Sequence, residues 1–292
     1  MNIDIALVQR LVATQFPQWA ELPIRPVKLS GWDNRTFHLG REMSVRLPSA
    51  EIYARAVQKE QEWLPKLAPH LPFSIPEPVA MGNPGEGYPW HWSIYRWLPG
   101  ETAARENVAD RNSFAADLAG FLKALQSVDP TDGPRRKLRG GSLELYGPQV
   151  EEALATLTAA KTINTGAAID IWQTAIEAPF EDDPVWYHGD VAAGNLLVKD
   201  GKLSAVIDFG GLGVGDPACD MTIAWTLLDA PSRRVFRKAI DISDSIWNRG
   251  RGWALWKGMI VVSGLIDTNA IEAASSQYAI DQLIADHESR KR

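Results

Sequence analysis

The spacing of apolar residues changes near Pro99 and Gly100, and this change limits the folds open to the chain. Before that point, short apolar runs separated by glycine and proline turns are typical of strands, and one helix-like segment, residues 49–67, interrupts them. Beyond it, apolar residues recur mainly at helical spacing. The sequence therefore predicts an α+β chain with a small β-rich lobe, residues 1–98, and a larger, mainly helical lobe, residues 99–292.

The expected elements follow from these patterns. Strands are expected at residues 26–29, 36–39, 43–47, 78–81, 91–97, 196–198 and 205–207. Helices are expected at residues 2–16, 49–67, 114–125, 147–160 and 167–178, and over most of 217–289. Residues 129–141, rich in proline, glycine and arginine, are expected to form an exposed loop.

The composition argues against several classes of function. A formal net charge of −6 disfavours a nucleic-acid partner and is compatible with a cationic small molecule. A single cysteine, Cys219, excludes an intrachain disulfide, and with five scattered histidines no zinc site is expected. The N-terminus does not read as a signal peptide, and no apolar run approaches the roughly 18–20 residues of a membrane span. We expect a soluble, cytoplasmic protein without a membrane partner.

Two short motifs concentrate the polar residues suited to catalysis. The first is His-Gly-Asp-Val-Ala-Ala-Gly-Asn, residues 188–195, and the second is Asp-Phe-Gly, residues 208–210. Each lies on a loop beside a short apolar strand, where a rigid scaffold can fix polar side chains. Asn195 follows Asp190 by 5 residues, and Asp208 follows Asn195 by 13.

This spacing is typical of phosphoryl transfer. Protein kinases place a base aspartate five residues before a metal-binding asparagine, with a metal-binding aspartate in a later Asp-Phe-Gly. The reaction needs a carboxylate for the proton of the acceptor hydroxyl and oxygen ligands for Mg²⁺. Either motif alone could be an ordinary turn, but the two together predict a kinase site. Gly189 replaces the arginine of protein kinases, and no Ala-Pro-Glu follows Asp208, so a protein kinase is disfavoured. His188 is expected to bond the loop backbone.

These motifs resemble those of the aminoglycoside phosphotransferase and choline kinase family, whose catalytic motif is His-Gly-Asp-x-x-x-x-Asn. The resemblance is specific over residues 185–220. It implies a bilobal, protein-kinase-like fold, with Asp190 as the catalytic base and Asn195 and Asp208 as ligands of Mg²⁺. It also implies that Asp220 supports the catalytic loop by hydrogen bonds.

The same resemblance indicates a nucleotide site in the first lobe, although no P-loop motif is present. The turn that contains Ser30 resembles the family's nucleotide-positioning loop, with an ordinary hairpin turn as the alternative. Arg46 is expected to take the place of the usual lysine on the phosphates, held by Glu60 in preference to Glu62. A solvated surface pair is the alternative for Arg46 and Glu60.

By the same resemblance, residues 93–100 are expected to link the lobes. The carbonyl of Arg96 and the N–H of Leu98 would bond the adenine edge, without a role for the Arg96 side chain. Backbone contacts of this kind leave both ATP and GTP open as phosphoryl donors.

The acceptor has few sequence signals. An aminoglycoside is the acceptor class that the resemblance indicates best, with choline, homoserine, sugar or ketosamine alcohols as alternatives. The alternative from another class of protein is a nucleotide-binding pseudokinase. The presence of Asp190, Asn195 and Asp208 argues against it, but Arg46 in place of the usual lysine leaves it open. The candidate acceptor ligands, each more often a solvated carboxylate, are Glu151, Glu152, Asp229, Asp267, Glu272 and Asp281; Trp225, Trp253 and Trp256 are expected in the core.

Overall fold

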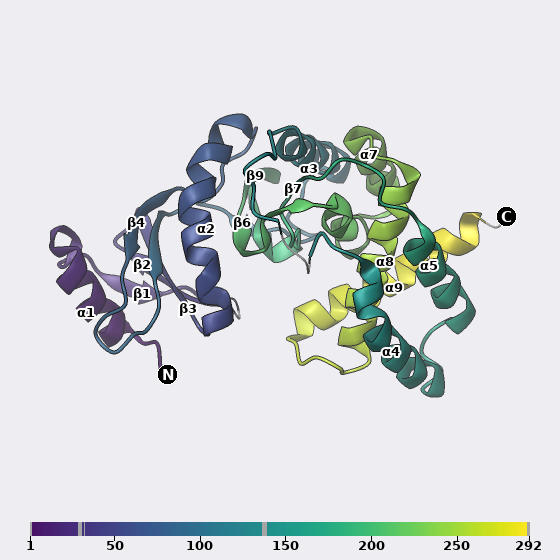
Figure 1. Cartoon of the computed structure of the whole chain (residues 1–292), viewed down its shortest axis with the longest axis horizontal. Helices are drawn as coiled ribbons and strands as arrows, with labels where there is room; N and C mark the ends of the chain where they lie inside the picture. The colour runs from purple at the N-terminus through teal and green to yellow at the C-terminus, as the bar shows by residue number, and fades with distance from the viewer. Residues whose placement is uncertain (1, 29–30, 32, 136–138, 291–292) are drawn as a thin grey trace. The chain divides into compact units, whose positions relative to one another are not determined.

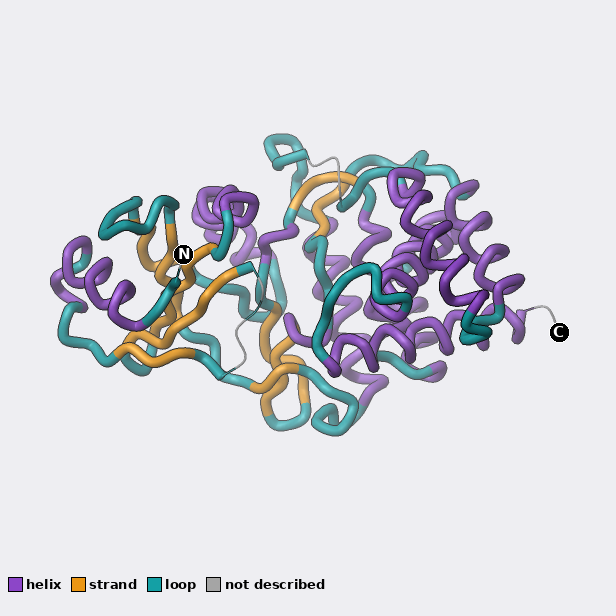
Figure 2. The backbone as a smooth tube through the Cα atoms, turned by 90° about the horizontal axis from the view of Figure 1, so that it is seen from below, coloured by secondary structure: helices purple, strands orange, loops and turns teal. Residues whose placement is uncertain are grey.

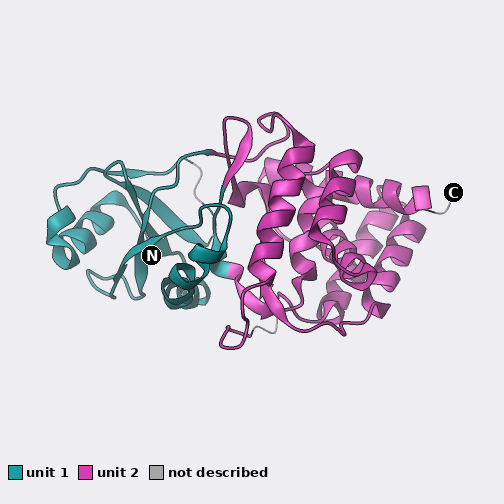
Figure 3. Cartoon of the chain, turned by 90° about the horizontal axis from the view of Figure 1, so that it is seen from above, with its two compact units in different colours: residues 1–100, 205–210 teal, residues 101–204, 211–292 magenta. Residues whose placement is uncertain are grey.

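The computed structural model describes residues 2–28, 31, 33–135 and 139–290. The chain divides into two compact units (Figure 3). The first comprises Met1–Gly100 together with Ala205–Gly210, and the second comprises Glu101–Ser204 together with Gly211–Arg292. Asp208 thus belongs to the first unit, although it lies more than a hundred residues beyond Gly100 in the sequence.

The first unit is built on an antiparallel sheet, several strands of which are labelled in Figure 1. The strand order in this sheet is β1-β2-β3-β5-β4. Its strands are β1 (Ile24–Pro26), β2 (Asn34–Leu39), β3 (Met43–Pro48), β4 (Pro78–Gly82) and β5 (Trp92–Arg96). Its helices are α1 (Ile5–Gln15) and α2 (Glu51–Leu67), with 3-10 turns η1 (Pro17–Trp19) and η2 (Ala68–His70).

Helices α1 and α2 pack on opposite faces of this sheet. Successive side chains of a strand point to opposite faces. Val45 and Leu47 of β3 belong to the apolar cluster that includes the buried face of α1. Arg46, which lies between them, instead pairs with Glu60 of α2. The alternation of side chains along β3 therefore places Arg46 on the face of the sheet that α2 covers, where little of its side chain is exposed to solvent.

The second unit is mainly helical. Its helices are α3 (Arg111–Gln126), α4 (Gly147–Ala159), α5 (Thr165–Glu177), α6 (Ile223–Thr226), α7 (Ala230–Ile240), α8 (Asp244–Val262) and α9 (Ala270–Arg290). Its 3-10 turns include η3 (Leu143–Tyr146), η4 (Ala193–Asn195) and η6 (Pro217–Thr222), and η5 (Phe209–Gly211) begins in the first unit. Helix α8 packs against α4, α5 and α9 and is buried on most sides. Figure 2 shows most of the helices, in purple, gathered in the part of the chain that ends at the C-terminus.

Short strands fix both ends of the His-Gly-Asp motif. They are β6 (Glu101–Thr102), β7 (Val185–Tyr187), β8 (Leu196–Lys199), β9 (Lys202–Val206) and β10 (Gly213–Gly215). Strand β7 ends one residue before His188 and pairs with β10, while β8 begins one residue after Asn195 and lies between β6 and β9. The loop between β7 and β8 is therefore anchored at each end by backbone pairing.

Most predicted elements are present within a few residues of their expected bounds. The first strand is an exception. It covers Ile24–Pro26, whereas the sequence predicts residues 26–29, the last of which lies outside the described residues. Ile24 pairs with Leu39 in the sheet, and both side chains are buried in the apolar cluster. The gain from burying this isoleucine explains why the strand starts earlier than its local pattern predicted. Across the described residues, no helix combines the length and the apolar character needed to cross a bilayer.

Candidate active site

Asp190 and Asn195, which the sequence predicts to act together, are joined by hydrogen bonds. The side-chain amide of Asn195 donates to the carbonyl oxygen of Asp190 at 2.9 Å and to its Oδ2 at 3.1 Å. The 3-10 turn η4 brings the asparagine back toward the aspartate across the intervening residues. The Asp190 side chain is 46% exposed, so the carboxylate is open to a reactant.

Asp220 holds the backbone that precedes Asp190. Its two carboxylate oxygens accept the N–H groups of His188 and Gly189, each at 2.7 Å. Asp220 is fully buried, and this burial raises the pKa of its carboxyl group. His188 is also buried, and its Nδ1 accepts the N–H of Asp190 at 3.2 Å. The structural roles expected for Asp220 and His188 are confirmed.

The backbone geometry explains the glycine at position 189. Gly189 has a φ of 86°, in the left-handed region that favours glycine. A Cβ at this position would lie 2.4 Å from the carbonyl oxygen of Gly211. An arginine, as in protein kinases, does not fit here. Gly211 is the residue at which the chain enters the second unit, three positions beyond Asp208.

Arg139 is a site residue that the sequence analysis missed. Its Nη1 donates to the carbonyl oxygen of Gly189 at 2.7 Å and to Oδ1 of Asp190 at 3.1 Å. The prediction that residues 129–141 form an exposed loop is therefore wrong for Arg139, whose side chain is 34% exposed. Burial opposes the charged form, but the negative charge of Asp190 and its hydrogen bond leave the pKa of Arg139 above its ordinary value.

In the first unit, Arg46 joins two carboxylates. Its Nη1 lies 3.7 Å from Oε2 of Glu60, and its Nη2 donates to Oδ1 of Asp208 at 3.1 Å. Tyr95 donates its hydroxyl hydrogen to the same oxygen of Glu60. The side chains of Arg46 and Glu60 are only 14% and 6% exposed, which excludes the solvated surface pair. Glu62 pairs instead with Lys66 on the surface, so Glu60 is confirmed as the partner of Arg46.

The charges around Arg46 keep it protonated. Burial alone would lower its pKa, but the negative charges of Asp208 and then Glu60 outweigh that effect and raise the pKa above the ordinary value of arginine. A permanently charged guanidinium is suited to bind phosphate oxygens in a fork-like geometry.

Asn195 and Asp208 present the oxygen atoms that Mg²⁺ prefers. The amide nitrogen of Asn195 donates to Asp190. The amide oxygen of the same Asn195 side chain takes no part in these two hydrogen bonds. Asp208 is a partly exposed carboxylate with a φ of 66°, a backbone conformation that is uncommon outside glycine and is found at functional sites. Within the described part of the chain, no three His, Cys, Asp or Glu side chains form a separate metal cluster. A carboxylate and an amide carbonyl fit a cation that takes most of its other ligands from water and phosphate.

The remaining nucleotide residues are placed as follows. Ser30 lies outside the described residues. Arg96 ends β5; its backbone N–H donates to the carbonyl of Glu77, and its exposed side chain pairs with the Glu77 carboxylate at 3.0 Å. Leu98 follows two residues later and is partly buried. The side chain of Arg96 is thus occupied on the surface, and any adenine contact would fall to the backbone.

Several candidate acceptor ligands have other partners. Asp229 caps α7 and pairs with Arg111. Glu272 pairs with Lys257 at 2.8 Å, and Asp281 accepts from Gln277. Glu151 and Glu152 are exposed on α4. The three tryptophans expected in the core are buried in the second unit: Trp225, Trp253 and Trp256.

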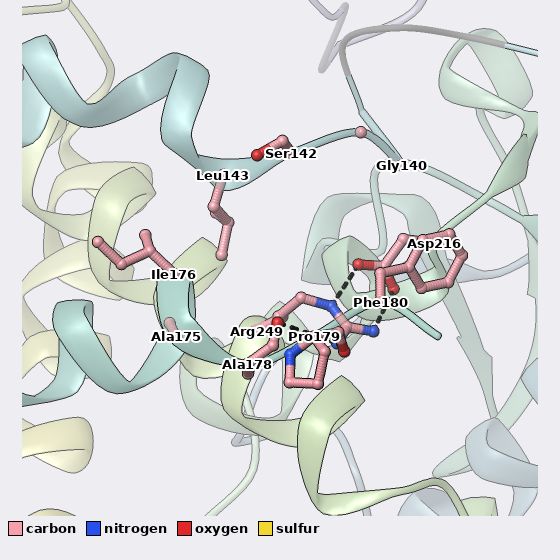
Figure 4. Close-up of a pocket in the computed structure, with 11 residues that line it drawn as sticks. Gly140, Ser142, Leu143, Ala175, Ile176, Ala178, Pro179, Phe180, Asp216 and Arg249 are labelled. Atoms are coloured by element: carbon pink, nitrogen blue, oxygen red, sulfur yellow. Dashed lines mark hydrogen bonds and ion pairs between the residues drawn. The ribbon is translucent and has the colours of Figure 1, made fainter. Parts of the chain in front are cut away.

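The second unit also contains a cavity of about 290 Å³ (Figure 4). Its wall includes residues 140–143 and the end of α5, and its polar groups are Asp216 and Arg249. Arg249 donates to both carboxylate oxygens of Asp216, at 2.6 and 3.1 Å, and also to the carbonyl of Pro179. This buried ion pair joins Asp216, at the start of η6, to Arg249 on α8, so the two charges neutralise each other inside the second unit.

Comparison with known proteins places the chain among phosphotransferases. The phosphotransferase enzyme family matches residues 24–256. An aminoglycoside 3'-phosphotransferase of Escherichia coli is 39% identical over 191 residues, which span 61% of this chain and 66%, just under two thirds, of that relative.

Solved structures share the fold. The GDP and kanamycin complex of APH(2")-IIia is 17% identical and has a TM-score of 0.72, over 98% of this chain and 99% of that one. The macrolide 2'-phosphotransferase MphH from Brachybacterium faecium, as an apoenzyme, is 20% identical with a TM-score of 0.60, over 95% and 98% of the two chains. The predicted family, the kinase-like fold class and the phosphotransferase class are confirmed. The chain belongs to the phosphotransferase enzyme family.

Proposed function

We propose that this protein transfers the γ-phosphoryl group of a Mg-bound nucleoside triphosphate to a hydroxyl group of an aminoglycoside. The observation that supports this most strongly is the pairing of Asp190 with Asn195 on a loop held by buried Asp220. The name of the E. coli relative and the kanamycin complex support an aminoglycoside as the acceptor class. The net charge of −6 agrees with a cationic acceptor.

In the proposed reaction, Asp190 is the general base. The acceptor oxygen forms a bond to the γ-phosphorus as the bond from that phosphorus to the bridging oxygen breaks, and the nucleoside diphosphate leaves. The proton of the acceptor hydroxyl passes to a carboxylate oxygen of Asp190 and then to solvent, to which this side chain is open.

Asn195 and Asp208 are the proposed ligands of Mg²⁺ through their amide carbonyl and carboxylate oxygens. The bound cation would neutralise charge on the phosphate oxygens. Asn195 would serve a second purpose, because its amide nitrogen donates to Asp190 and its amide oxygen would be the ligand of the cation.

We assign nucleotide binding to residues 1–98, with either ATP or GTP as donor. Arg46 would bind phosphate oxygens while it is paired with Glu60, which itself accepts a hydrogen bond from Tyr95. Ser30 would bond phosphate oxygens, and the backbone of Arg96 and Leu98 would bond the base. Because such donors are cytoplasmic metabolites, the proposed location is the cytoplasm.

An acceptor-dependent screen of nucleotide consumption tests this function. The purified protein would be incubated with Mg-ATP or Mg-GTP and, in separate reactions, aminoglycosides, macrolides, choline, homoserine and ketosamines. We expect turnover above the background rate only with aminoglycosides. Turnover with another class would reassign the acceptor, and nucleotide binding without turnover would favour the pseudokinase alternative.

A further inference from the structure

Arg139 contacts the catalytic loop at two points. One nitrogen, Nη1, reaches both the carbonyl oxygen of Gly189 and Oδ1 of Asp190. The other carboxylate oxygen of Asp190, Oδ2, accepts from Asn195. The carboxylate is therefore held from both sides, by a cation on one oxygen and an amide on the other.

The backbone of Arg139 is itself held in place. Tyr187, the last residue of β7, donates its hydroxyl hydrogen to the carbonyl of Arg139. The next residue, Gly140, has a φ of 75°, and its carbonyl accepts the N–H of Asp216 at 3.1 Å. A Cβ on Gly140 would lie 2.2 Å from the Tyr187 ring, so only glycine allows this approach.

The strand that leads into the catalytic loop thus also anchors the arginine that binds the loop. Tyr187 immediately precedes His188 in the sequence and contacts the segment that carries Arg139. The backbone of Arg139 and the loop that carries Asp190 are both held by other residues. The contact between Arg139 and Asp190 therefore resists rotation of the carboxylate better than a mobile surface arginine would. The charge of Arg139 is permanent, because Asp190 favours its protonated form.

We propose that Arg139 is a positioning residue that fixes the orientation of the Asp190 carboxylate for proton transfer. This inference rests on the proposed role of Asp190 as the base. A carboxylate oxygen offers two lone pairs, so an oxygen that accepts one hydrogen bond can still accept the proton of the acceptor hydroxyl. When the plane of the carboxylate is fixed, that second lone pair points in a fixed direction, toward the place where the acceptor hydroxyl would bind.

Kinetics of three variants test the proposal. Arg139→Ala is expected to lower kcat by about 10- to 100-fold, with KM for nucleotide and acceptor within about twofold of wild type. Arg139→Lys is expected to recover part of the loss, because an ammonium group can bond one of the two oxygens. Arg135→Ala is the matched control, since Arg135 is an exposed arginine on the same segment, and it is expected to behave like wild type. Added guanidinium ion is expected to restore part of the kcat of Arg139→Ala, and to have no such effect on the other two variants.

A double substitution tests whether Arg139 acts through Asp190. In an Asp190→Asn background, Arg139→Ala is expected to cost less than about threefold, because the orientation of the base no longer matters. A full additional loss would mean that Arg139 acts on the reactants directly and would overturn the proposal. An unchanged kcat in Arg139→Ala, or a loss confined to KM, would overturn it too.

Hydrogen exchange separates this proposal from the proposed function. We expect faster amide exchange in the peptide that carries residues 188–195 in Arg139→Ala, and wild-type exchange there in Arg135→Ala. If wild-type protein shows no acceptor-dependent turnover, the proposed function fails, and hydrogen exchange still decides whether Arg139 holds the loop. Unchanged exchange in Arg139→Ala would refute that role in either case, as would loosening spread evenly over the whole chain.

Discussion

Arg46 donates a 3.1 Å hydrogen bond to Asp208, a residue 162 positions later in the sequence. The aspartate of the Asp-Phe-Gly motif is thereby bound to the arginine that we propose to take the place of the usual kinase lysine. Arg46 also pairs with Glu60 on α2, which accepts a hydrogen bond from Tyr95. Within the first unit, these contacts link the partly exposed Asp208 to the shielded side chains of Arg46, Glu60 and Tyr95.

Removing Glu60 should destabilise the protein. Glu60→Ala leaves Arg46 with one carboxylate instead of two and leaves the buried Tyr95 hydroxyl without this acceptor, so we expect a loss of about 2–3 kcal/mol in the free energy of unfolding. Glu62→Ala, two residues away in the exposed pair with Lys66, should change it by less than about 0.5 kcal/mol. Urea denaturation of both variants measures the difference. Equal effects would contradict the buried role of Glu60.

Asp208→Asn should weaken nucleotide binding only when Mg²⁺ is present, because the substitution removes the charge of a proposed metal ligand. Isothermal titration calorimetry with ATP, with and without Mg²⁺, measures this. Asp200→Asn is the control, since Asp200 is an exposed carboxylate in the turn between β8 and β9. An affinity for Mg-ATP unchanged by Asp208→Asn would remove Asp208 from the metal site.

Gly189→Ala should disturb the catalytic loop. The added Cβ would collide with the carbonyl oxygen of Gly211, and the φ of 86° is costly for alanine, so we expect a loss of about 1–3 kcal/mol in stability. Gly194→Ala in the same loop is the comparison, because a Cβ there would meet no described atom within 4 Å. Thermal unfolding of the two variants tests this, and a Gly189→Ala protein as stable as Gly194→Ala would contradict the geometry.

The stabilising effect of Asp229 should depend on pH. Hydrogen bonds from Ser232, strengthened by Arg111, lower the pKa of Asp229 to about 2 in the folded protein, below its ordinary value. The ionised carboxylate caps α7, so Asp229→Ala should cost about 1 kcal/mol at pH 7. Because the folded pKa is the lower one, this contribution is present above about pH 4 and is lost as the pH falls toward about 2. Denaturation of both proteins between those pH values should show the difference shrinking; a constant difference would count against the charged cap.

The geometry of the loop at residues 188–195 could be predicted because its signal is local. Asp190, Asn195 and their spacing lie within one short segment, and the strands on either side are apolar runs that the sequence shows directly. The choice of Glu60 over Glu62 followed from the resemblance to the family, and the structure places Glu60 on the buried face of α2.

Arg139 could not be predicted in the same way. It lies 51 residues before Asp190, in a segment whose arginines and glycines are typical of a solvated loop. Its position depends on the Tyr187 hydroxyl and on the turn at Gly140, neither of which a local pattern reveals. The sequence could not single out an acceptor ligand for a related reason, since helix caps and ion pairs such as those of Asp229 and Glu272 use the same residue types as ligand sites.

The mass of the acceptor after reaction tests the central claim most directly. An aminoglycoside would be incubated with Mg-ATP and either wild-type protein or Asp190→Asn, and the product analysed by mass spectrometry. We predict that wild-type protein adds one phosphoryl group and that Asp190→Asn, which should still bind Mg-ATP, does so at least about 10²- to 10⁴-fold more slowly. Phosphorylation by Asp190→Asn at the wild-type rate would contradict the role of Asp190 as the base.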